Sequence, residues 1–356
     1  MAQSHKPLNV AVLGATGAVG QRFVQLLEGH PWFRVTELVA SDRSAGQRYG
    51  DAVRWVLPGN PPAELTGREV LPLDADLQSP IVFSALPADI AQTVEWRLAE
   101  AGHVVCSNAS AYRMHEHVPI LLPEINAEHA ELVQVQRQKY GWTTGGLVTN
   151  SNCTSAPVAM AFAPLRQFGI AAAFLTSLQA VSGSGYPGLP SLDILDNVIP
   201  FINGEEPKLE AEPRKMLGRL DGDHIAFLDY AASATCTRVP VLDGHLVSVS
   251  VRFQQDVSEE QILAAWRDFR GPEPVPSLPS APPQPVICHS APDRPQPRRD
   301  RDAGKGMAAV VGRLRPCPVI GGWKFLALAH NTVRGAAGCS ILNAELLVAQ
   351  GLVAGA

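Results

Sequence analysis

Leu8-Asn-Val-Ala-Val-Leu13 and Gly14-Ala-Thr-Gly-Ala-Val-Gly20 are consecutive near the start of the chain. The first is a compact apolar strand, and the second is a glycine-rich turn that opens a helix with apolar residues between 23 and 27. Glycines in such a turn allow the backbone to approach a pyrophosphate, and the helix N-terminus supplies N–H donors. The order of strand, turn and helix therefore favours dinucleotide binding over an ordinary tight turn.

The residues after a second predicted strand, at 35–40, bear on which dinucleotide binds. They read Ser41-Asp42-Arg43-Ser44-Ala45-Gly46. An arginine flanked by hydroxyls suits a 2′-phosphate and so favours NADP, whereas Asp42 could instead hold a ribose hydroxyl, and a solvated surface turn is the remaining alternative. We expect NADP to contact both turns, at Gly14, Thr16, Gly17, Ala18, Val19, Ser41, Arg43 and Ser44.

Strands and helices continue to alternate through the first part of the chain. Residues 81–87 and 104–106 read as buried strands, and residues 90–101 between them read as a helix. This alternation predicts an α/β fold with a Rossmann-like, doubly wound parallel sheet over roughly the first 150 residues. Because 356 residues exceed one ordinary core, we expect two domains.

The middle of the chain follows a different pattern. Residues 237–242 and 245–253 read as strands separated by Asp243-Gly244, a strong signal for a two-residue hairpin turn. We therefore expect a mixed or antiparallel sheet in a second, α+β domain, with the second strand burying one face. The proline-dense stretch 271–285 is expected to be an extended loop, and residues 336–353 a helix.

Composition argues against several classes of function. A formal net charge of −5 gives no reason to expect a nucleic-acid partner, and no apolar run reaches the roughly 20 residues that a membrane span needs. The six cysteines lack metal-like or disulfide-like spacing, so we expect free thiols and no metal site. Residues 1–7 are polar and lead directly into a strand, without a visible signal peptide. These features predict a cytoplasmic protein.

Cys153, in the stretch Ser-Asn-Cys-Thr-Ser at 151–155, falls between a predicted strand and a predicted helix. We expect Ser155 to cap that helix, which has Pro157 in its first turn. A thiol beside a helix N-terminus feels free N–H groups and the positive end of the helix dipole, which favour the thiolate. A buried structural cysteine is the alternative.

Two polar residues on the predicted hairpin could serve such a thiol. Arg238 and His245 lie on one face of the ribbon, about 13 Å apart along it. Pro240 between them is expected to introduce a bulge that shortens this separation. Taken singly, a surface ion pair for Arg238 and a structural role for His245 are the ordinary alternatives.

Two further stretches are of interest. Gln179 precedes a glycine-rich loop at 180–188 that suits close approach to a substrate. A helix is expected to begin near Glu205, which makes Lys208 its neighbour on the helix surface. A solvated helix start with an acid in its first turn is the alternative for this pair.

Motifs in order along almost the whole chain resemble the aspartate-semialdehyde dehydrogenase family, in the branch found in archaea and fungi. They are Gly-Ala-Thr-Gly-Ala-Val-Gly (14–20), Ser-Asn-Ala-Ser-Ala-Tyr-Arg-Met (107–114), Pro-Glu-Ile-Asn (123–126), Asn-Cys-Thr-Ser (152–155), Gln-Ala-Val-Ser-Gly (179–183), Gly-Glu-Glu-Pro-Lys (204–208), Arg-Val-Pro-Val-Leu-Asp-Gly-His (238–245) and Asn-Thr-Val-Arg-Gly-Ala-Ala-Gly (331–338). The fourth differs from the Asn-Cys-Ser-Thr common in this branch but keeps a hydroxyl beside the thiol. The resemblance implies an NADP-binding domain at 1–152 and 337–356, and a catalytic and oligomerisation domain at 153–336.

The resemblance also implies a role for each site residue. Cys153 would be the nucleophile, His245 the acid/base, and Gln179 a catalytic residue that helps to position the substrate. Arg238 would hold the substrate carboxylate and Glu205 its ammonium group. Arg113 and Lys208 would bind the phosphate, and Asn152 would support Cys153. Additional contacts with the cofactor would come from Ser84, Leu86, Ser182, Gly183 and Asn331.

The reaction implied is the NADP-dependent reductive dephosphorylation of L-4-aspartyl phosphate to L-aspartate 4-semialdehyde through a cysteine thioester. This step serves the biosynthesis of lysine, threonine, methionine and isoleucine. A coenzyme A-dependent acyl reductase such as malonyl-CoA reductase would share Cys153, His245 and NADP, but Glu205 as an ammonium partner favours the amino-acid substrate. A non-catalytic NADP-binding regulator would lack part of the site, whereas the thiol, glutamine, arginine and histidine are all present. As the family forms dimers or tetramers, we expect a homodimer or homotetramer.

Overall fold

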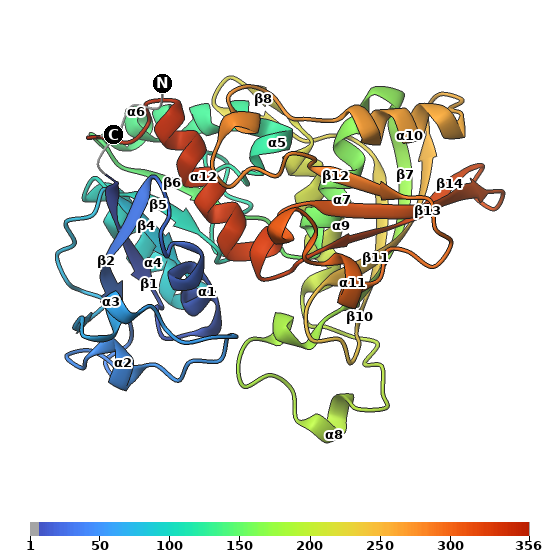
Figure 1. Ribbon diagram of the computed structural model, residues 1–356. Coiled ribbons are helices and arrows are strands. Elements are labelled where there is room, and N and C mark those ends of the chain that lie inside the picture. Colours follow the sequence, from blue (N-terminus) through green and yellow to red (C-terminus); the bar gives the residue numbers. More distant parts are fainter. Residues whose placement is uncertain (1–6, 356) are drawn as a thin grey trace.

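The strand predicted near the start of the chain, β1 (Leu8–Leu13), lies in the middle of a parallel sheet (Figure 1). Within residues 7–355, which the computed structural model describes, this sheet has six strands in the order β3-β2-β1-β4-β5-β6. The other five are β2 (Phe33–Val39), β3 (Val70–Leu71), β4 (Ile81–Ser84), β5 (Val104–Ser107) and β6 (Gly146–Thr149). This is a doubly wound strand order, so the predicted Rossmann-like sheet is confirmed.

Helices cover both faces of the parallel sheet (Figure 1). On one face, Phe23 and Phe83 share a core with Leu342 and Leu346 from the last helix, so the end of the chain returns to the first sheet. On the other, Ala91 and Leu98 pack on Val82 and Leu147. The helices of this region are α1 (Ala18–Leu26), α2 (Tyr49–Ala52), α3 (Ala63–Thr66), α4 (Ala88–Glu100), α5 (Pro123–Asn126), the 3-10 turn η1 (Ala127–Glu131), α6 (Leu132–Tyr140) and α12 (Gly338–Ala349). Domain boundaries at 152/153 and 336/337 stay a prediction.

The second sheet is mixed, as predicted, with the strand order β10-β7-β11-β14-β13-β12. Its outer pairs, β10 with β7 and β12 with β13, are parallel, and the inner pairs are antiparallel. Along β11, burial alternates as expected, from a buried His245 to a buried Phe253. The strands are β7 (Ile170–Gln179), β10 (Ala231–Arg238), β11 (His245–Phe253), β12 (Val286–His289), β13 (Ala309–Cys317) and β14 (Gly322–Ala329), and a separate ribbon joins β8 (Arg219–Asp221) to β9 (His224–Ala226).

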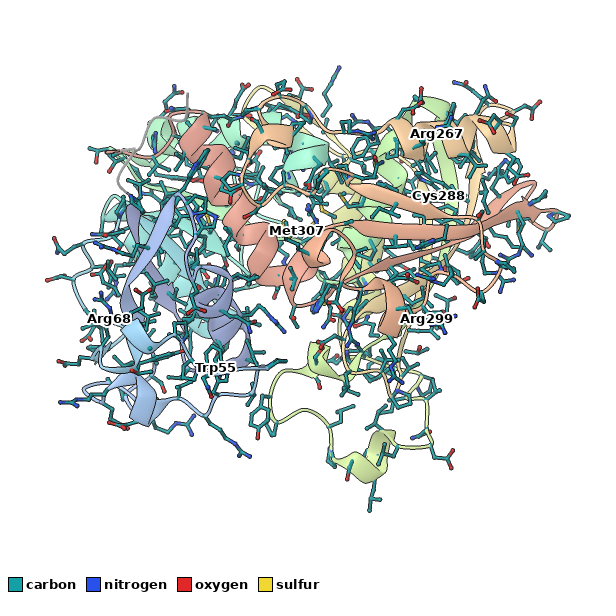
Figure 2. All side chains as sticks on the ribbon, viewed as in Figure 1. Trp55, Arg68, Arg267, Cys288, Arg299 and Met307 are labelled. Atoms are coloured by element: carbon teal, nitrogen blue, oxygen red, sulfur yellow. The ribbon has the colours of Figure 1, made fainter. Side chains whose placement is uncertain are left out.

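Three helices pack on the mixed sheet: α7 (Ser155–Phe162), α9 (Glu205–Met216) and α10 (Glu259–Asp268). Phe162 and Trp266 from these helices meet Phe325 of β14 in the second core, whereas Met307 lies beside α12 and belongs to the first (Figure 2). The proline-dense stretch is a loop except for one short turn, η4. The remaining elements are η2 (Ala163–Phe168), η3 (Val181–Ser184), α8 (Ser191–Ile194), η4 (Val275–Ser277), α11 (Pro297–Asp300), η5 (Ala303–Gly306) and the π-helical turn η6 (Val333–Ala337).

The predicted hairpin is wrong. Strand β7 lies between β10 and β11, so Asp243-Gly244 is not a two-residue turn between paired strands. Residues 239–244 instead cross the end of β7 and form hydrogen bonds with the last residue of β7 and the loop that follows it. The Val239 N–H donates to the Gln179 carbonyl (3.0 Å), and the Val181 N–H donates to the Val241 carbonyl (2.8 Å). Asp243-Gly244 is a signal from neighbouring residues only. Strand β7 is distant in sequence, and each of its two edges pairs with one of the strands β10 and β11.

The start of α7 also differs from the prediction. Ser155 is the first helical residue and does not cap the helix; Thr154 precedes it, without a side-chain cap. The amide oxygen of Asn152 accepts the N–H of Thr154 itself at 2.8 Å, which fixes the turn that precedes the helix. No helix within residues 7–355 has both the length and the apolar character that a membrane span requires. Residues 1–6, which bore on the expected lack of a signal peptide, lie outside the described part of the chain.

Candidate active site

Three predicted site residues lie side by side at one end of the mixed sheet. Gln179 ends β7 and Arg238 ends the parallel strand β10, and these two residues are directly paired. His245 begins β11, which runs antiparallel to β7 with Leu246 opposite Leu178. All three are almost completely buried. The distance of about 13 Å expected from a hairpin does not apply, because three adjacent strands end together here.

The loop after β7 closes over this end of the sheet at Gly183. A Cβ atom on Gly183 would lie 2.7 Å from Arg238 Nη1 and 3.0 Å from His245 Nε2, so a side chain there would displace the guanidinium or the imidazole. Arg238 Nη1 donates to the Ala180 carbonyl at 2.8 Å, which ties the loop to the arginine. Arg238 and His245 therefore face the same small space above Gly183.

His245 is held as a neutral ring with its proton on Nε2. The Ala180 N–H donates to Nδ1 at 3.0 Å, so Nδ1 is the acceptor, while Nε2 is buried and has no hydrogen-bond partner within residues 7–355. Burial, followed by the positive charge of Arg238, lowers the pKa of His245 to about 3. The imidazole thus presents an N–H donor toward the space that it shares with Arg238.

Cys153 lies two residues before α7 and is a free, partly buried thiol. Burial and then the negative charge of Glu205 raise the pKa of Cys153 to about 12, whereas Arg113 and Arg238 act in the opposite direction. The sequence argument considered only the helix N-terminus, which favours the thiolate. Without substrate, burial and Glu205 outweigh it, so the thiol is protonated near neutral pH.

Glu205 connects several of the predicted residues. Its carboxylate accepts hydrogen bonds from Asn152 Nδ2 (3.0 and 2.9 Å), Lys208 Nζ (3.0 Å) and Gln179 Nε2 (3.3 Å). Glu205 is the first residue of α9, as predicted, and is 9 % exposed. An anion this buried and this well bonded can hold a cationic group of a substrate next to Cys153.

Arg113 reaches the same region from the parallel sheet side. Its Nε donates to the Asn150 carbonyl (2.8 Å), Nη2 to the Asn108 carbonyl (2.8 Å), and Nη1 to Glu212 Oε1 (3.1 Å). The second oxygen of Glu212 accepts the main-chain N–H of Asn152 at 2.5 Å. Glu212 was missed in the sequence, although it is seven residues after Glu205 and so lies on the same face of α9.

The glycine-rich turn fits a dinucleotide. Gly14 has φ of +70°, and a Cβ atom there would lie 2.8 Å from the Ala85 carbonyl, so the backbone takes a path that excludes side chains. Gly17 caps α1 without a side-chain hydrogen bond, which leaves first-turn N–H groups of residues such as Ala18 and Val19 for a phosphate. The Thr16 carbonyl is bound by Gln21 Nε2, which fixes the turn.

The other predicted cofactor residues lie at three further places. Ser84 ends the neighbouring strand β4 and its buried hydroxyl has no partner within the described residues, with Leu86 just beyond. Asn331 Nδ2 donates to Ser182 Oγ at 2.8 Å, which brings two distant segments together. Ser41, Arg43 and Ser44 form a turn after β2 in which Ser41 and Arg43 are exposed and Ser44 is half-buried, and the Ser44 N–H donates to the Ser41 carbonyl at 2.8 Å.

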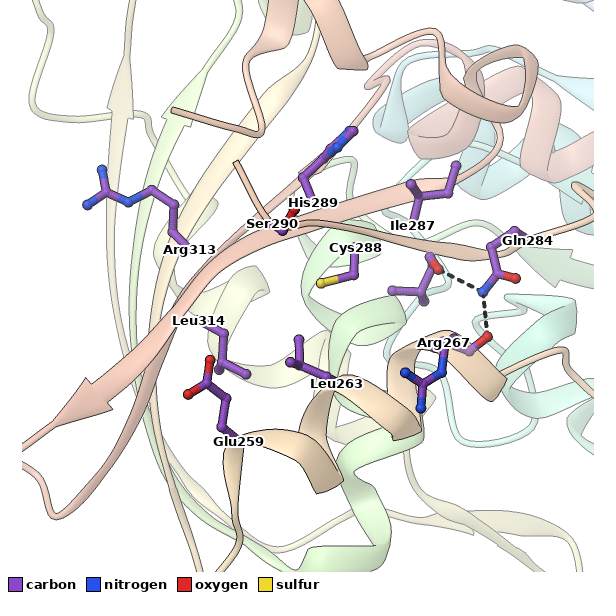
Figure 3. Close-up of a pocket in the computed structure, with 11 residues that line it drawn as sticks. Glu259, Leu263, Arg267, Gln284, Ile287, Cys288, His289, Ser290, Arg313 and Leu314 are labelled. Carbon is purple, nitrogen blue, oxygen red and sulfur yellow. Dashed lines mark hydrogen bonds between the residues drawn. The ribbon is translucent and has the colours of Figure 1, made fainter. Parts of the chain in front are cut away.

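A separate surface pocket of about 470 Å³ lies between α10 and the strands β12 and β13 (Figure 3). Cys288 and His289 line it, but no predicted site residue does. Gln284 Nε2 donates there to the carbonyls of Arg267 (3.1 Å) and Val286 (2.9 Å), which are structural contacts. The pocket is therefore distinct from the region around Cys153.

Two family models match this chain. Residues 9–133 match the family model described as "Semialdehyde dehydrogenase, NAD binding domain", and residues 162–334 match "Semialdehyde dehydrogenase, dimerisation domain". Aspartate-semialdehyde dehydrogenases from Archaeoglobus fulgidus and Methanothermobacter thermautotrophicus are 51% and 45% identical, over 97% and 96% of this chain and 99% of each relative.

Solved structures are similar over nearly the full length. Aspartate-semialdehyde dehydrogenase from Candida albicans, solved with NADP, has a TM-score of 0.89 and 38% identity over 98% of this chain and 100% of that one. The enzyme II from Vibrio cholerae, complexed with ASA, has a TM-score of 0.76 and 25% identity over 97% and 99%. With archaeal and fungal relatives at this level of identity over their whole length, the chain belongs to the aspartate-semialdehyde dehydrogenase family.

Proposed function

We propose that the protein converts L-4-aspartyl phosphate into L-aspartate 4-semialdehyde, with NADP as its nucleotide, as a step in the biosynthesis of lysine, threonine, methionine and isoleucine. The observation that carries the proposal is the set of charged groups beside Cys153. Glu205 and, through Glu212, Arg113 are both bonded to Asn152, the residue before the thiol. Arg238 is paired with Gln179, which also donates to Glu205. An anionic and two cationic groups around one nucleophile match a substrate that has an ammonium group, a carboxylate and a phosphate.

The first step is a displacement at Cys153. Sulfur forms a bond to the acyl carbon, and the bond from that carbon to the phosphate oxygen breaks. The proton of the thiol ends on the departing phosphate, so hydrogen phosphate leaves and a thioester remains. Arg113 and Lys208 are proposed to bind the phosphate, Arg238 the substrate carboxylate and Glu205 the ammonium. Binding of an ammonium at Glu205 would offset the charge that raises the pKa of Cys153, which favours the thiolate when substrate is present.

His245 is proposed as the acid/base, and Gln179 and Asn152 as groups that orient the substrate and the nucleophile. Because the neutral ring carries its proton on Nε2, His245 can donate a hydrogen bond to the oxygen that becomes negative when sulfur adds to the carbonyl. When bound, the nicotinamide nucleotide supplies the hydride for the reduction. Arg43 and its flanking serines support NADP over NAD.

The reverse reaction tests the proposal. Purified protein should reduce NADP when given aspartate semialdehyde and inorganic phosphate, and should not do so with malonate semialdehyde and coenzyme A. Activity only in the second mixture would replace the proposal with the coenzyme A-dependent acyl reductase. Activity in neither mixture would refute both enzymes.

We further propose a homodimer or homotetramer in the cytoplasm, formed through the open face of the mixed sheet. Buried Ala173 and Leu175 of β7 face the second core, so Phe174 between them faces outward and is 56% exposed. Phe174 is a solvent-exposed phenylalanine on a sheet face, within the residues that match the dimerisation-domain model. Both facts support this face as the subunit interface. Phe174→Asp should shift the protein to a smaller species in analytical ultracentrifugation, and an unchanged mass would exclude this face.

A further inference from the structure

We infer that Glu212 is a positioning residue that sets both the phosphate-binding arginine and the main chain just before the nucleophile. The inference rests on the proposed function, because it assigns Glu212 to the phosphate site of that reaction. Glu212 lies in the middle of α9 and is 2 % exposed. One of its oxygens faces Arg113 Nη1 and the other faces the Asn152 N–H, so a single carboxylate joins two parts of the site.

The contacts of Arg113 explain what Glu212 would achieve. A guanidinium has one N–H on Nε and two on each terminal nitrogen. The protein uses Nε–H for the Asn150 carbonyl, one N–H of Nη2 for the Asn108 carbonyl, and one N–H of Nη1 for Glu212. One N–H on each terminal nitrogen is left, which is the number that a two-oxygen contact with phosphate requires. Glu212 fixes the plane of the guanidinium, and so the direction of these two free N–H groups, and its negative charge balances the buried positive charge of Arg113.

The same helix holds the loop that carries Arg113. Lys215 Nζ donates at 2.8 Å to each of the carbonyls of Arg113, His115 and Val118, and burial lowers the pKa of Lys215 to about 8. Glu212 and Lys215 therefore act on the side chain and on the backbone of one loop. The residues of α9 that contact the site, Glu205, Lys208, Glu212 and Lys215, recur at helical spacing, so the helix presents a continuous polar face to it.

Glu212→Gln tests this role with little change in volume. A glutamine has one oxygen and one NH₂, so it can accept from Arg113 or from Asn152, and its NH₂ then faces the other donor. Loss of one charge-assisted bond of this kind should raise the KM for phosphate about 10- to 100-fold in the NADP-reducing direction. The KM for NADP should change less than about twofold, because the glycine-rich turn is held by Gln21 and Ala85 and not by residues of α9.

Glu210→Gln is the matched control. Glu210 lies on the same helix and also accepts a backbone N–H, that of Ala234 at 2.9 Å, but this contact is on β10 and away from Arg113. The control should keep the wild-type KM for phosphate. The double variant Arg113→Gln/Glu212→Gln should have the same KM for phosphate as Arg113→Gln alone, since Glu212 affects phosphate binding through the arginine and its contact with the Asn152 N–H concerns the nucleophile.

Protection of Cys153 from iodoacetamide by inorganic phosphate gives a readout that does not need turnover. In the wild type, phosphate should slow alkylation, and Glu212→Gln should require about 10- to 100-fold more phosphate for the same effect. Protection without any NADP reduction by the wild type would refute the proposed function and keep the role of Glu212. An unchanged KM for phosphate, equal phosphate protection, or additive effects in the double variant would overturn the inference.

Discussion

Gly335→Ala should displace the nucleophile. Gly335 lies in the buried π-helical turn η6, and a Cβ atom there would lie 2.7 Å from Cys153 Cβ and 2.8 Å from its Cα. Ordinary contacts begin near 3.4 Å, so one of the two segments must move by roughly 0.7 Å. Overpacking of this kind costs about 1–3 kcal/mol, and an error of about 1 Å at a reacting atom can lower the rate about 10²-fold. We therefore expect kcat/KM to fall roughly 10- to 100-fold.

Gly338→Ala separates this effect from a general loss of stability. Its added methyl would lie 2.6 Å from Met307 Sδ and 2.9 Å from Val333 Cγ1, so it overpacks the adjoining helix start without contacting Cys153. Both variants should lose a few degrees of Tm, but only Gly335→Ala should lose most of its kcat/KM and its rate of Cys153 alkylation. A kcat/KM of Gly335→Ala that equals the wild-type value would refute this packing argument. An equal fall of kcat/KM in both variants would also refute it.

Three further predictions concern charged groups. Glu205→Gln removes a charge that raises the pKa of Cys153, so iodoacetamide should alkylate the thiol several-fold faster. At the same time, kcat/KM for aspartate semialdehyde should fall about 10- to 100-fold, because the partner of the substrate ammonium is lost. Alkylation rate and kcat/KM that both rise or both fall would contradict the assignment. Arg238→Lys keeps the charge but not the planar fork, so kcat/KM should fall, and an unchanged value would argue against carboxylate binding there. Burial raises the pKa of Glu95 from its ordinary 4.5 to about 7, so its protonated form contributes stability that is complete below about pH 4.5 and is lost as the pH rises through 7. Relative to wild type, Glu95→Gln should therefore gain on the order of 3 kcal/mol in free energy of unfolding between pH 4.5 and pH 8, and a difference that does not vary with pH would contradict this.

Local signals in the sequence were sufficient for much of the fold. The apolar strand, the glycine-rich turn and the following helix predicted the first sheet because each is set by neighbouring residues. The hairpin prediction failed because β7 pairs between the two strands. Its residues lie 59 positions before their partners in β10, as with Ala172 and Ala231, and a turn signal contains no information on such a distant partner. This failure also hid how close Arg238 and His245 lie.

Several residues named from the sequence, such as Gln179, Arg238 and His245, lie together in the structure, but the contacts that connect them were not predicted. Glu205 and Lys208 were recognised as neighbours, yet the seven-residue spacing from Glu205 to Glu212 and from Lys208 to Lys215 already indicated one polar helix face. The state of Cys153 could not be predicted from the helix N-terminus alone. Its pKa depends on burial and on Glu205, both of which follow from tertiary packing.

The most direct test of the thioester at Cys153 is a single turnover without nucleotide. Protein mixed with excess L-4-aspartyl phosphate should release one phosphate per chain in a burst, and mass spectrometry should find one aspartyl group on the peptide that contains Cys153. Cys153→Ser should give neither the burst nor the adduct while still binding NADP. A burst of equal size in Cys153→Ser, or an adduct on any other residue, would contradict the account.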